Sequence, residues 1–142
     1  MKLVKHLLDS KGRDIISVAP GTSVFDAIKV MADKTVGSLI VMDDERLLGI
    51  ITERDYARKV ILKGRSSEDT PVSDIMTQDV LTTSSDKTVN DCMELMTERR
   101  IRHLPVVEGD RVIGMISIGD LVQAIISDQQ EEIEHLEHYI SG

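Results

Sequence analysis

The sequence predicts a mixed α/β protein made of two copies of one unit, each ordered strand, helix, strand, strand, helix. Two observations carry this prediction. A shift of 65 residues superimposes the copies without a gap and pairs identical residues: Asp26 with Asp91, Gly49 with Gly114, and Asp55 with Asp120. Each copy also contains one helix-starting motif followed by two apolar segments around a polar turn. The repeat therefore predicts a tandem fold.

The first strand and the first helix of each copy follow from local patterns. Residues 16–18 and 80–83 are short β-branched segments, which favour strands. Ser23-x-x-Asp26 and Thr88-x-x-Asp91 then supply an N-cap hydroxyl and a first-turn acid. Apolar side chains recur after each cap at i, i+3, i+4 and i+7, which predicts amphipathic helices.

The remaining elements are a hairpin and a second helix in each copy. Residues 38–42 and 47–52 form the first predicted hairpin, and residues 104–107 and 112–117 form the second. A helix is expected over residues 53–63 and from Ile118 onward. Residues 64–71, rich in Gly, Ser and acidic side chains, are the expected linker. Val4, Leu7 and Leu8 also indicate a short N-terminal helix.

Composition excludes several classes of protein as first expectations. The chain has 142 residues and a net charge of −8, which argues against nucleic-acid binding because duplex affinity depends on Lys and Arg. No apolar run approaches the ~20 residues that span a bilayer. The N-terminus does not resemble a signal peptide, and the single cysteine, Cys92, cannot form an internal disulfide. We therefore expect a cytoplasmic protein.

The repeated segments GIITERD and GMISIGD raise a chemical question, because each apolar strand ends in a hydroxyl and, three residues later, a carboxylate. Thr52 and Asp55 in the first copy, and Ser117 and Asp120 in the second, suit a ligand crevice at the strand end. A carboxylate accepts two hydrogen bonds side by side, as the hydroxyls of a ribose require, and a helix start favours phosphate. The same pattern is also a helix cap, and the two roles are compatible.

Three further motifs carry a family resemblance. They are Asp74-Ile-Met-Thr77, Arg100-Ile-Arg-His-Leu-Pro-Val106 and the two Gly-h-h-[Thr/Ser]-x-x-Asp segments, where h is apolar. Together they resemble a CBS-domain pair, or Bateman module, and especially the stand-alone bacterial CBS proteins. The resemblance covers about residues 10–127. It implies two CBS units packed sheet to sheet with pseudo-two-fold symmetry: residues 1–67 and 68–127, followed by an acidic helical tail over 128–142.

The resemblance implies a regulatory module without catalysis. Family members bind AMP, ADP, ATP, NAD or S-adenosylmethionine in clefts between the units and signal by conformational or oligomeric change. By position, Asp55 and Asp120 would hold ribose hydroxyls, and Thr52 and Ser117 would contact ribose or phosphate. The remaining expected ligand-binding residues are Ile16, Val18, Val36, Gly37, Ser38, Arg54, Val80, Thr82, Ile101, Arg102, His103 and Pro105. We expect no catalytic residue, no metal site and no catalytic cofactor.

The two copies differ in ways that predict unequal clefts. Arg54 in the first copy corresponds to Gly119 in the second, and Ile40 corresponds to Pro105. Arg99, Arg100, Arg102 and His103 form a basic cluster that fits a cleft rim, a solvated helix end or, less well, an RNA-binding patch, since aromatic residues are missing.

Other functions stay open as alternatives. The main one is a protein-interaction adaptor whose clefts are empty, and a nucleic-acid-associated protein is another. We set an enzyme aside because neither a Walker loop nor a dinucleotide fingerprint occurs. Ile133, Leu136 and Ile140 form a thin apolar stripe in the tail, which we expect to pack on the module or on a second subunit of a homodimer. The downstream protein partner is unknown.

Overall fold

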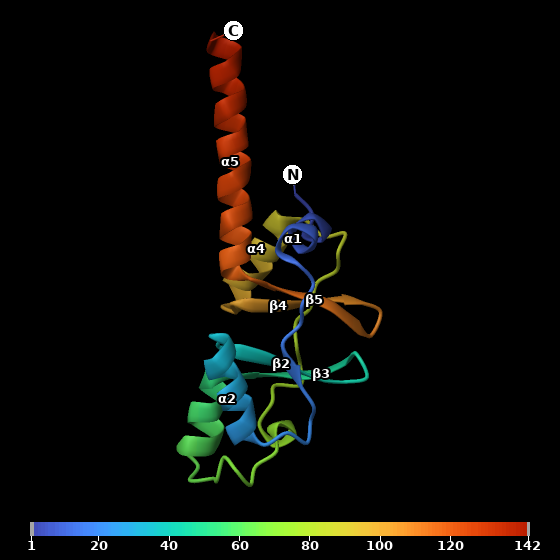
Figure 1. Cartoon of the computed structure of the whole chain (residues 1–142), viewed down its shortest axis with the longest axis vertical. Helices are drawn as coiled ribbons and strands as arrows, with labels where there is room; N and C mark the ends of the chain where they lie inside the picture. Colours follow the sequence, from blue (N-terminus) through green and yellow to red (C-terminus); the bar gives the residue numbers. More distant parts are fainter. Residues whose placement is uncertain (1, 142) are drawn as a thin grey trace. The chain divides into compact units, whose positions relative to one another are not determined.

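The computed structural model describes residues 2–141 and forms two compact units. The first unit consists of residues 15–81 with 109–112. The second consists of residues 2–14, 82–108 and 113–141, so the N-terminal segment belongs to the unit that contains the second copy of the repeat. Figure 1 traces both units along the chain.

The first unit is a small sheet covered by helical segments. Strand β1 (Ser17–Val18) pairs in parallel with β2 (Ser38–Asp43), which forms an antiparallel hairpin with β3 (Arg46–Thr52). Helix α2 (Val24–Lys34) precedes the hairpin, and α3 (Glu53–Tyr56) follows it. The expected helix over 53–63 changes character, because Ala57–Ile61 form a π-helical turn in which Leu62 N–H donates to the Ala57 carbonyl at 3.0 Å.

The core of the first unit confirms the predicted stripe on α2. Val24, Ala27 and Met31 are buried against the inner face of the hairpin and against the segment around a short 3₁₀ turn (Val72–Asp74). The other buried members of this core are Leu39, Val41, Ile51, Val60, Val72 and Ile75. The hydrophobic effect therefore closes this unit around one core that includes residues after the expected linker.

The second unit also contains a helix, a hairpin and a following helix, but it adds the N-terminal α1 and ends in a longer helix. Its elements are α1 (Val4–Lys11), α4 (Val89–Arg99), β4 (His103–Glu108), β5 (Arg111–Ser117), whose residues 113–117 lie in this unit, and α5 (Ile118–Ser141). Helix α1 buries Val4, Leu7 and Leu8, as the sequence predicts. No helix in the described part of the chain is long and apolar enough to cross a membrane.

One predicted strand is wrong. Residues 80–83 form no strand, and only Thr83 makes a parallel bridge, with Val106. Thr83 exchanges both backbone bonds with β4, donating to Pro105 O and accepting from Val107 N, each at 2.9 Å. The ladder ends there because the backbone turns on both sides: Val80 N–H donates to Gln78 O, and Lys87 N–H donates to Ser84 O. Local turns thus override the β-branched pattern.

The segments that precede α2 and α4 are anchored in the same way. Val72 N–H donates to Thr22 O in the first unit, and Val4 N–H donates to Lys87 O in the second, both at 2.8 Å. These anchors bring the chain against the strand glycines. A Cβ at Gly49 would lie 2.7 Å from Met76 Sδ, and one at Gly114 would lie 2.6 Å from Leu8 Cδ2. Gly49 is required for this approach, because the Thr77 carbonyl oxygen would also lie only 2.8 Å from its Cβ, whereas at Gly114 the close atoms all belong to the Leu8 side chain.

Candidate functional site

Each repeated motif forms a corner where a strand ends and a helix begins. Thr52 ends β3 and Asp55 lies in the first turn of α3, whereas Ser117 ends β5 and Asp120 lies in the first turn of α5. We call these the first and the second acidic corner. In both, the hydroxyl accepts from the Asp N–H at 3.1 Å, and the Asp Oδ2 accepts from the N–H of the hydroxyl residue. The capping interpretation of the motif is therefore confirmed at both corners.

At the first corner the carboxylate is fully engaged by its own unit. Asp55 Oδ2 accepts from Thr52 N–H at 3.0 Å and from Thr52 Oγ1 at 3.1 Å. Asp55 Oδ1 lies 3.0 Å from Lys59 Nζ and accepts from Thr77 Oγ1 at 3.5 Å. Lys59 Nζ also donates to the Ile75 carbonyl at 2.9 Å. Asp55 is only 7% exposed, so both of its oxygens serve a structural network.

Backbone contacts join the first corner to segments that contain predicted site residues. Glu53 N–H donates to Gly37 O at 3.1 Å, and Ser38 stands opposite Thr52 in the β2–β3 register. Ile16 O accepts from Ile40 N, and Val18 pairs with Val41. Val36 and Gly37 are half-buried, whereas Arg54 is exposed. Ser38 and Thr52 thus meet at one end of the small sheet, whereas Val18 pairs with Val41, further along β2.

At the second corner the carboxylate is held from one side only. Asp120 Oδ2 lies 2.6 Å from Lys11 Nζ and accepts from Ser117 N–H at 2.8 Å. Lys11 Nζ also donates to the Met115 carbonyl at 2.7 Å. Among the described residues, no hydrogen bond or ion pair reaches Asp120 Oδ1. The Asp120 side chain is 26% exposed, so this oxygen is an available acceptor.

The charges around the second corner shift two pKa values. Burial is the largest influence on Asp120 and raises its pKa, but the Lys11 ammonium and the hydrogen bonds from Ser117 outweigh it, so the net pKa is lowered. Burial is the largest influence on His103 and lowers its pKa. The Asp120 carboxylate raises this pKa, whereas the charges of Lys11 and Arg102 lower it further. At neutral pH both shifts favour an ionised Asp120 carboxylate and a neutral His103 imidazole.

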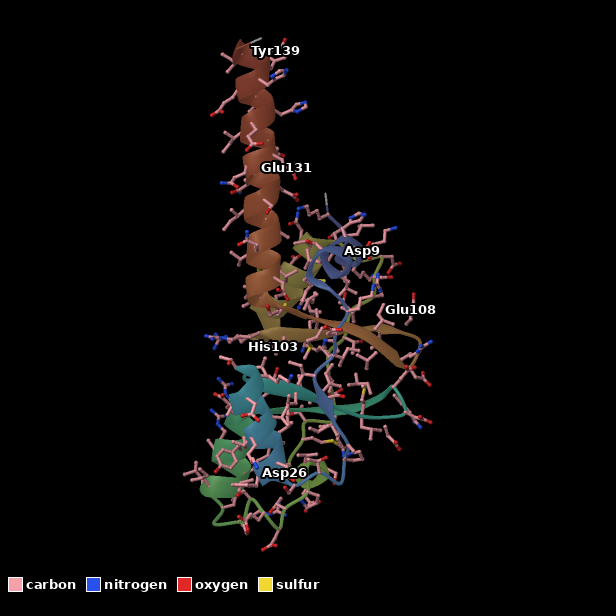
Figure 2. The ribbon with its side chains drawn as sticks, in the orientation of Figure 1. Asp9, Asp26, His103, Glu108, Glu131 and Tyr139 are labelled. Atoms are coloured by element: carbon pink, nitrogen blue, oxygen red, sulfur yellow. The ribbon has the colours of Figure 1, made fainter. Side chains whose placement is uncertain are left out.

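The other predicted residues of the second copy divide into two groups. Ile118 N–H donates to Arg102 O at 2.9 Å, as Glu53 does to Gly37 O in the first copy. Figure 2 marks His103, the first residue of β4. Ile101 and Pro105 flank it along the chain, half-buried and buried. Thr82 instead lines a cavity of about 350 Å³ beside Cys92 that includes neither Ser117 nor Asp120. Val80 belongs to the first unit.

Sequence reasoning did not predict that a lysine pairs with the aspartate at either corner. Lys59 lies four residues after Asp55, a spacing at which opposite charges meet on a helix, so a local signal was present. Lys11 is 109 residues from Asp120, and no sequence pattern links them. No group of three or more His, Cys, Asp or Glu side chains suited to a metal ion occurs within the described residues.

Comparison with known proteins identifies the family. The model of the CBS domain matches residues 4–62 and 72–127. The chain belongs to the CBS-domain family. The mixed α/β fold and the tandem CBS organisation expected from the sequence are thereby confirmed.

Solved CBS structures and curated CBS relatives are similar over most of the chain. A provisionally assigned signal-transduction protein with CBS domains from Burkholderia ambifaria is 50% identical, covers 90% of this chain and 96% of its own, and has a TM-score of 0.84. The CBS domain pair of MJ0100, in complex with 5′-methylthioadenosine and S-adenosyl-L-methionine, is 26% identical, covers 90% and 98%, and has a TM-score of 0.76.

The mitochondrial CBS domain-containing protein CBSX3 of Arabidopsis thaliana is 46% identical over 98% of this chain and 72% of its own length. A second Arabidopsis relative, CBSCBSPB5, is 36% identical, but the chain spans only 22% of it. CBS pairs therefore occur in proteins of very different length.

Proposed function

We propose that this CBS pair is a regulatory module that binds an adenine-containing nucleotide and uses the second acidic corner as its principal ligand site. The observation that carries the proposal is the free Oδ1 of Asp120, which contrasts with the saturated carboxylate of Asp55. A ribose hydroxyl needs a carboxylate oxygen that accepts without first breaking a protein contact. Of the two acidic corners, only the second offers such an oxygen.

The second corner also supplies charge for an anionic ligand. Lys11 stays on Oδ2 while a ribose hydroxyl donates to Oδ1, so the ammonium remains beside the ligand rather than being displaced. Arg102, whose charge helps to lower the pKa of His103, adds a second cation near this corner. The first N–H groups of α5 add the partial positive charge of a helix start. A nucleotide with a phosphate should therefore bind more tightly than adenosine.

The first corner is the weaker site in this proposal. A ribose there has to replace Lys59 or Thr77 on a carboxylate that is 7% exposed, and each lost contact costs about 0.5–3 kcal/mol. The engaged carboxylate of Asp55 favours the adaptor alternative, in which a cleft carries no ligand, for the first corner. If the second corner also binds no ligand, the adaptor alternative holds for the whole chain.

The similar proteins support the ligand class and the regulatory role. The MJ0100 pair is complexed with two adenosine derivatives, and the Burkholderia relative is provisionally assigned to signal transduction. Ligand binding would act by favouring one of two conformations or assemblies, to an extent set by its difference in affinity for them.

Isothermal titration calorimetry of the purified chain with AMP, ATP, S-adenosylmethionine and adenosine tests the proposal. We expect saturable binding of at least one of them at one dominant site, with phosphate-bearing ligands ahead of adenosine. Mass spectrometry of the denatured protein identifies any nucleotide that copurifies. If none of the four ligands binds and none copurifies, the adaptor alternative replaces the sensor.

A further inference from the structure

A groove in the second unit lies between α5 and the start of α4. It has a volume of about 920 Å³, and Lys2 and Val89 form part of its lining. Helix α5 supplies most of the rest, including Ile125, Asp128, Glu132 and Leu136. Because these positions of α5 are three or four residues apart, they lie on one face of the helix. The groove therefore follows one face of α5.

Carboxylates dominate the wall that α5 forms. Asp128, Glu131 and Glu132 line the groove, and the cation among its lining residues, Lys2, lies with its Nζ 3.4 Å from Asp128 Oδ1. The Glu131 and Glu132 carboxylates make no hydrogen bond or ion pair with the other described residues. None of the 17 Lys and Arg residues follows Arg111, so no carboxylate of α5 has a Lys or Arg partner on its own helix.

This charge opposes the helix that carries it. Glu134 lies three residues after Glu131 and three before Glu137, a spacing at which like charges destabilise a helix. Figure 2 marks Glu131 on this stretch, whose residues 129–140 are helical and exposed. The predicted stripe of Ile133, Leu136 and Ile140 does not pack on its own unit, because these side chains are 54–82% exposed. A cationic partner along this face would remove the repulsion and stabilise the helix.

The groove also offers apolar surface between its carboxylates. Val89 is 3% exposed, Ile125 is half-buried and Leu136 is 62% exposed. Aliphatic side chains placed against Ile125 and Leu136 would remove apolar area from water. A hydrated cation would pair with the carboxylates but would gain nothing from Leu136. Apolar residues spaced along a helix with a charged rim suit an amphipathic helix bound in a groove.

We propose that this groove docks a cationic amphipathic helix of a partner protein. Its aliphatic side chains pack on Ile125 and Leu136, and its Lys or Arg side chains pair with Glu131 and Glu132. Charge complementarity selects this occupant, because like charge opposes both α5 of a second copy and an anionic membrane surface. The groove contains neither Ser117 nor Asp120, so the proposal does not depend on nucleotide binding.

Fluorescence anisotropy with a labelled peptide measures docking on the full chain. The probe is a helix of about 14 residues made only of leucine and lysine, with the leucines on one face; it is long enough to span Ile125 to Leu136. The control peptide has glutamate in place of lysine. We expect saturable binding of the lysine peptide, weakened by added salt, and none of the glutamate peptide. A lysine peptide that does not bind overturns the proposal.

Paired variants of equal charge then locate the site. Glu131→Gln with Glu132→Gln removes two carboxylates from the groove, whereas Glu134→Gln with Glu137→Gln removes two that do not line it. The first pair should weaken binding of the lysine peptide about tenfold, and the second by less than about threefold. Equal losses would mean that the peptide responds to the overall charge of α5, which overturns the groove as the site.

An apolar variant tests whether the groove binds more than charge. Leu136→Ala should weaken binding of the lysine peptide about threefold to tenfold, because apolar area on the peptide stays in water. Ile140→Ala, an exposed control outside the groove, should leave the affinity unchanged. Unchanged affinity in Leu136→Ala, or spermine that binds as tightly as the peptide, indicates a site for cations alone. Self-association of the chain that Glu131→Gln with Glu132→Gln abolishes indicates a second copy. Each of these results overturns the proposal.

Discussion

The two acidic corners share a backbone but differ in where their lysine comes from. Both have the same hydroxyl-to-Asp capping bonds, so duplication preserved the turn. At the first corner Lys59 comes from the helix that Asp55 begins; at the second, position 124 is an alanine, and Lys11 arrives from α1. Lys59 and Thr77 fill Asp55 Oδ1, whereas Lys11 uses only Asp120 Oδ2.

This difference shows how a copied motif can acquire two roles. The first carboxylate stabilises its own unit, and the second keeps an acceptor available while still capping a helix. Arg54, which the sequence suggested as the source of asymmetry, is exposed, and its side chain makes no hydrogen bond or ion pair with the other described residues. Within the chain, the asymmetry between the corners lies in the Asp–Lys pairs, and the role of Arg54 towards a ligand stays a prediction.

The largest expected effect is on ligand affinity. Asp120→Asn should weaken AMP binding about 10- to 100-fold, because a hydrogen bond to a charged group contributes about 1.5–3 kcal/mol. Asp55→Asn, the matched variant at the first corner, should change the affinity by less than about threefold. Calorimetry measures both. Equal losses in the two variants would contradict unequal corners.

The opposite ranking is expected for stability. Asp55→Ala removes a cap and leaves Lys59 without its carboxylate in a mostly buried network, which should lower the free energy of unfolding by about 2–3 kcal/mol. Asp120→Ala removes a cap and a more exposed pair, so about 1 kcal/mol is expected. Urea denaturation compares them. A larger loss for Asp120→Ala would mean that the second carboxylate is the structural one.

A smaller effect on affinity should show whether Lys11 acts at the second corner through its charge on the phosphate or by positioning Asp120. Lys11→Ala should weaken AMP binding several-fold and leave adenosine binding nearly unchanged, because the ammonium acts on the phosphate. Lys59→Ala is the control at the first corner and should leave both affinities unchanged. If Lys11→Ala weakens AMP and adenosine equally, Lys11 only positions Asp120.

The smallest effect concerns pH. Because the folded protein lowers the pKa of His103, the unfolded chain binds the proton first, and the free energy of unfolding should fall as the pH drops below about 6.5. Asp120 also has a lowered pKa, so its stabilisation is present above about pH 4 and is lost below that value. Denaturation of His103→Gln and of the native chain at several pH values isolates the loss below about 6.5. If the free energy of unfolding of His103→Gln depends on pH as that of the native chain does, a group other than His103 causes this loss.

The sequence predicted most of the fold, because caps, hairpins and helix stripes are local or repeated patterns. Ser23 and Thr88 cap their helices, and both hairpins form within a residue or so of the expected positions. It failed at two places where the local backbone departs from the expected geometry. Residues 80–83 lack room for a ladder between turns, and the π-helical turn at Ala57–Ile61 has no signature in the pattern.

The sequence predicted which motif residues form the two corners, but it did not predict how their carboxylates are bonded. The motif identified Thr52, Asp55, Ser117 and Asp120, but not which carboxylate keeps a free oxygen. That depends on Lys11, which joins Asp120 only because α1 packs in the same unit. Sequence alone does not contain that contact.

A crystal structure of the chain with AMP tests the central claim most directly. The account predicts a ribose hydroxyl within hydrogen-bond distance of Asp120 Oδ1, with Lys11 still on Oδ2 and the Asp55–Lys59 pair intact. A ribose bound to Asp55, with Lys59 displaced and Asp120 unoccupied, would contradict it.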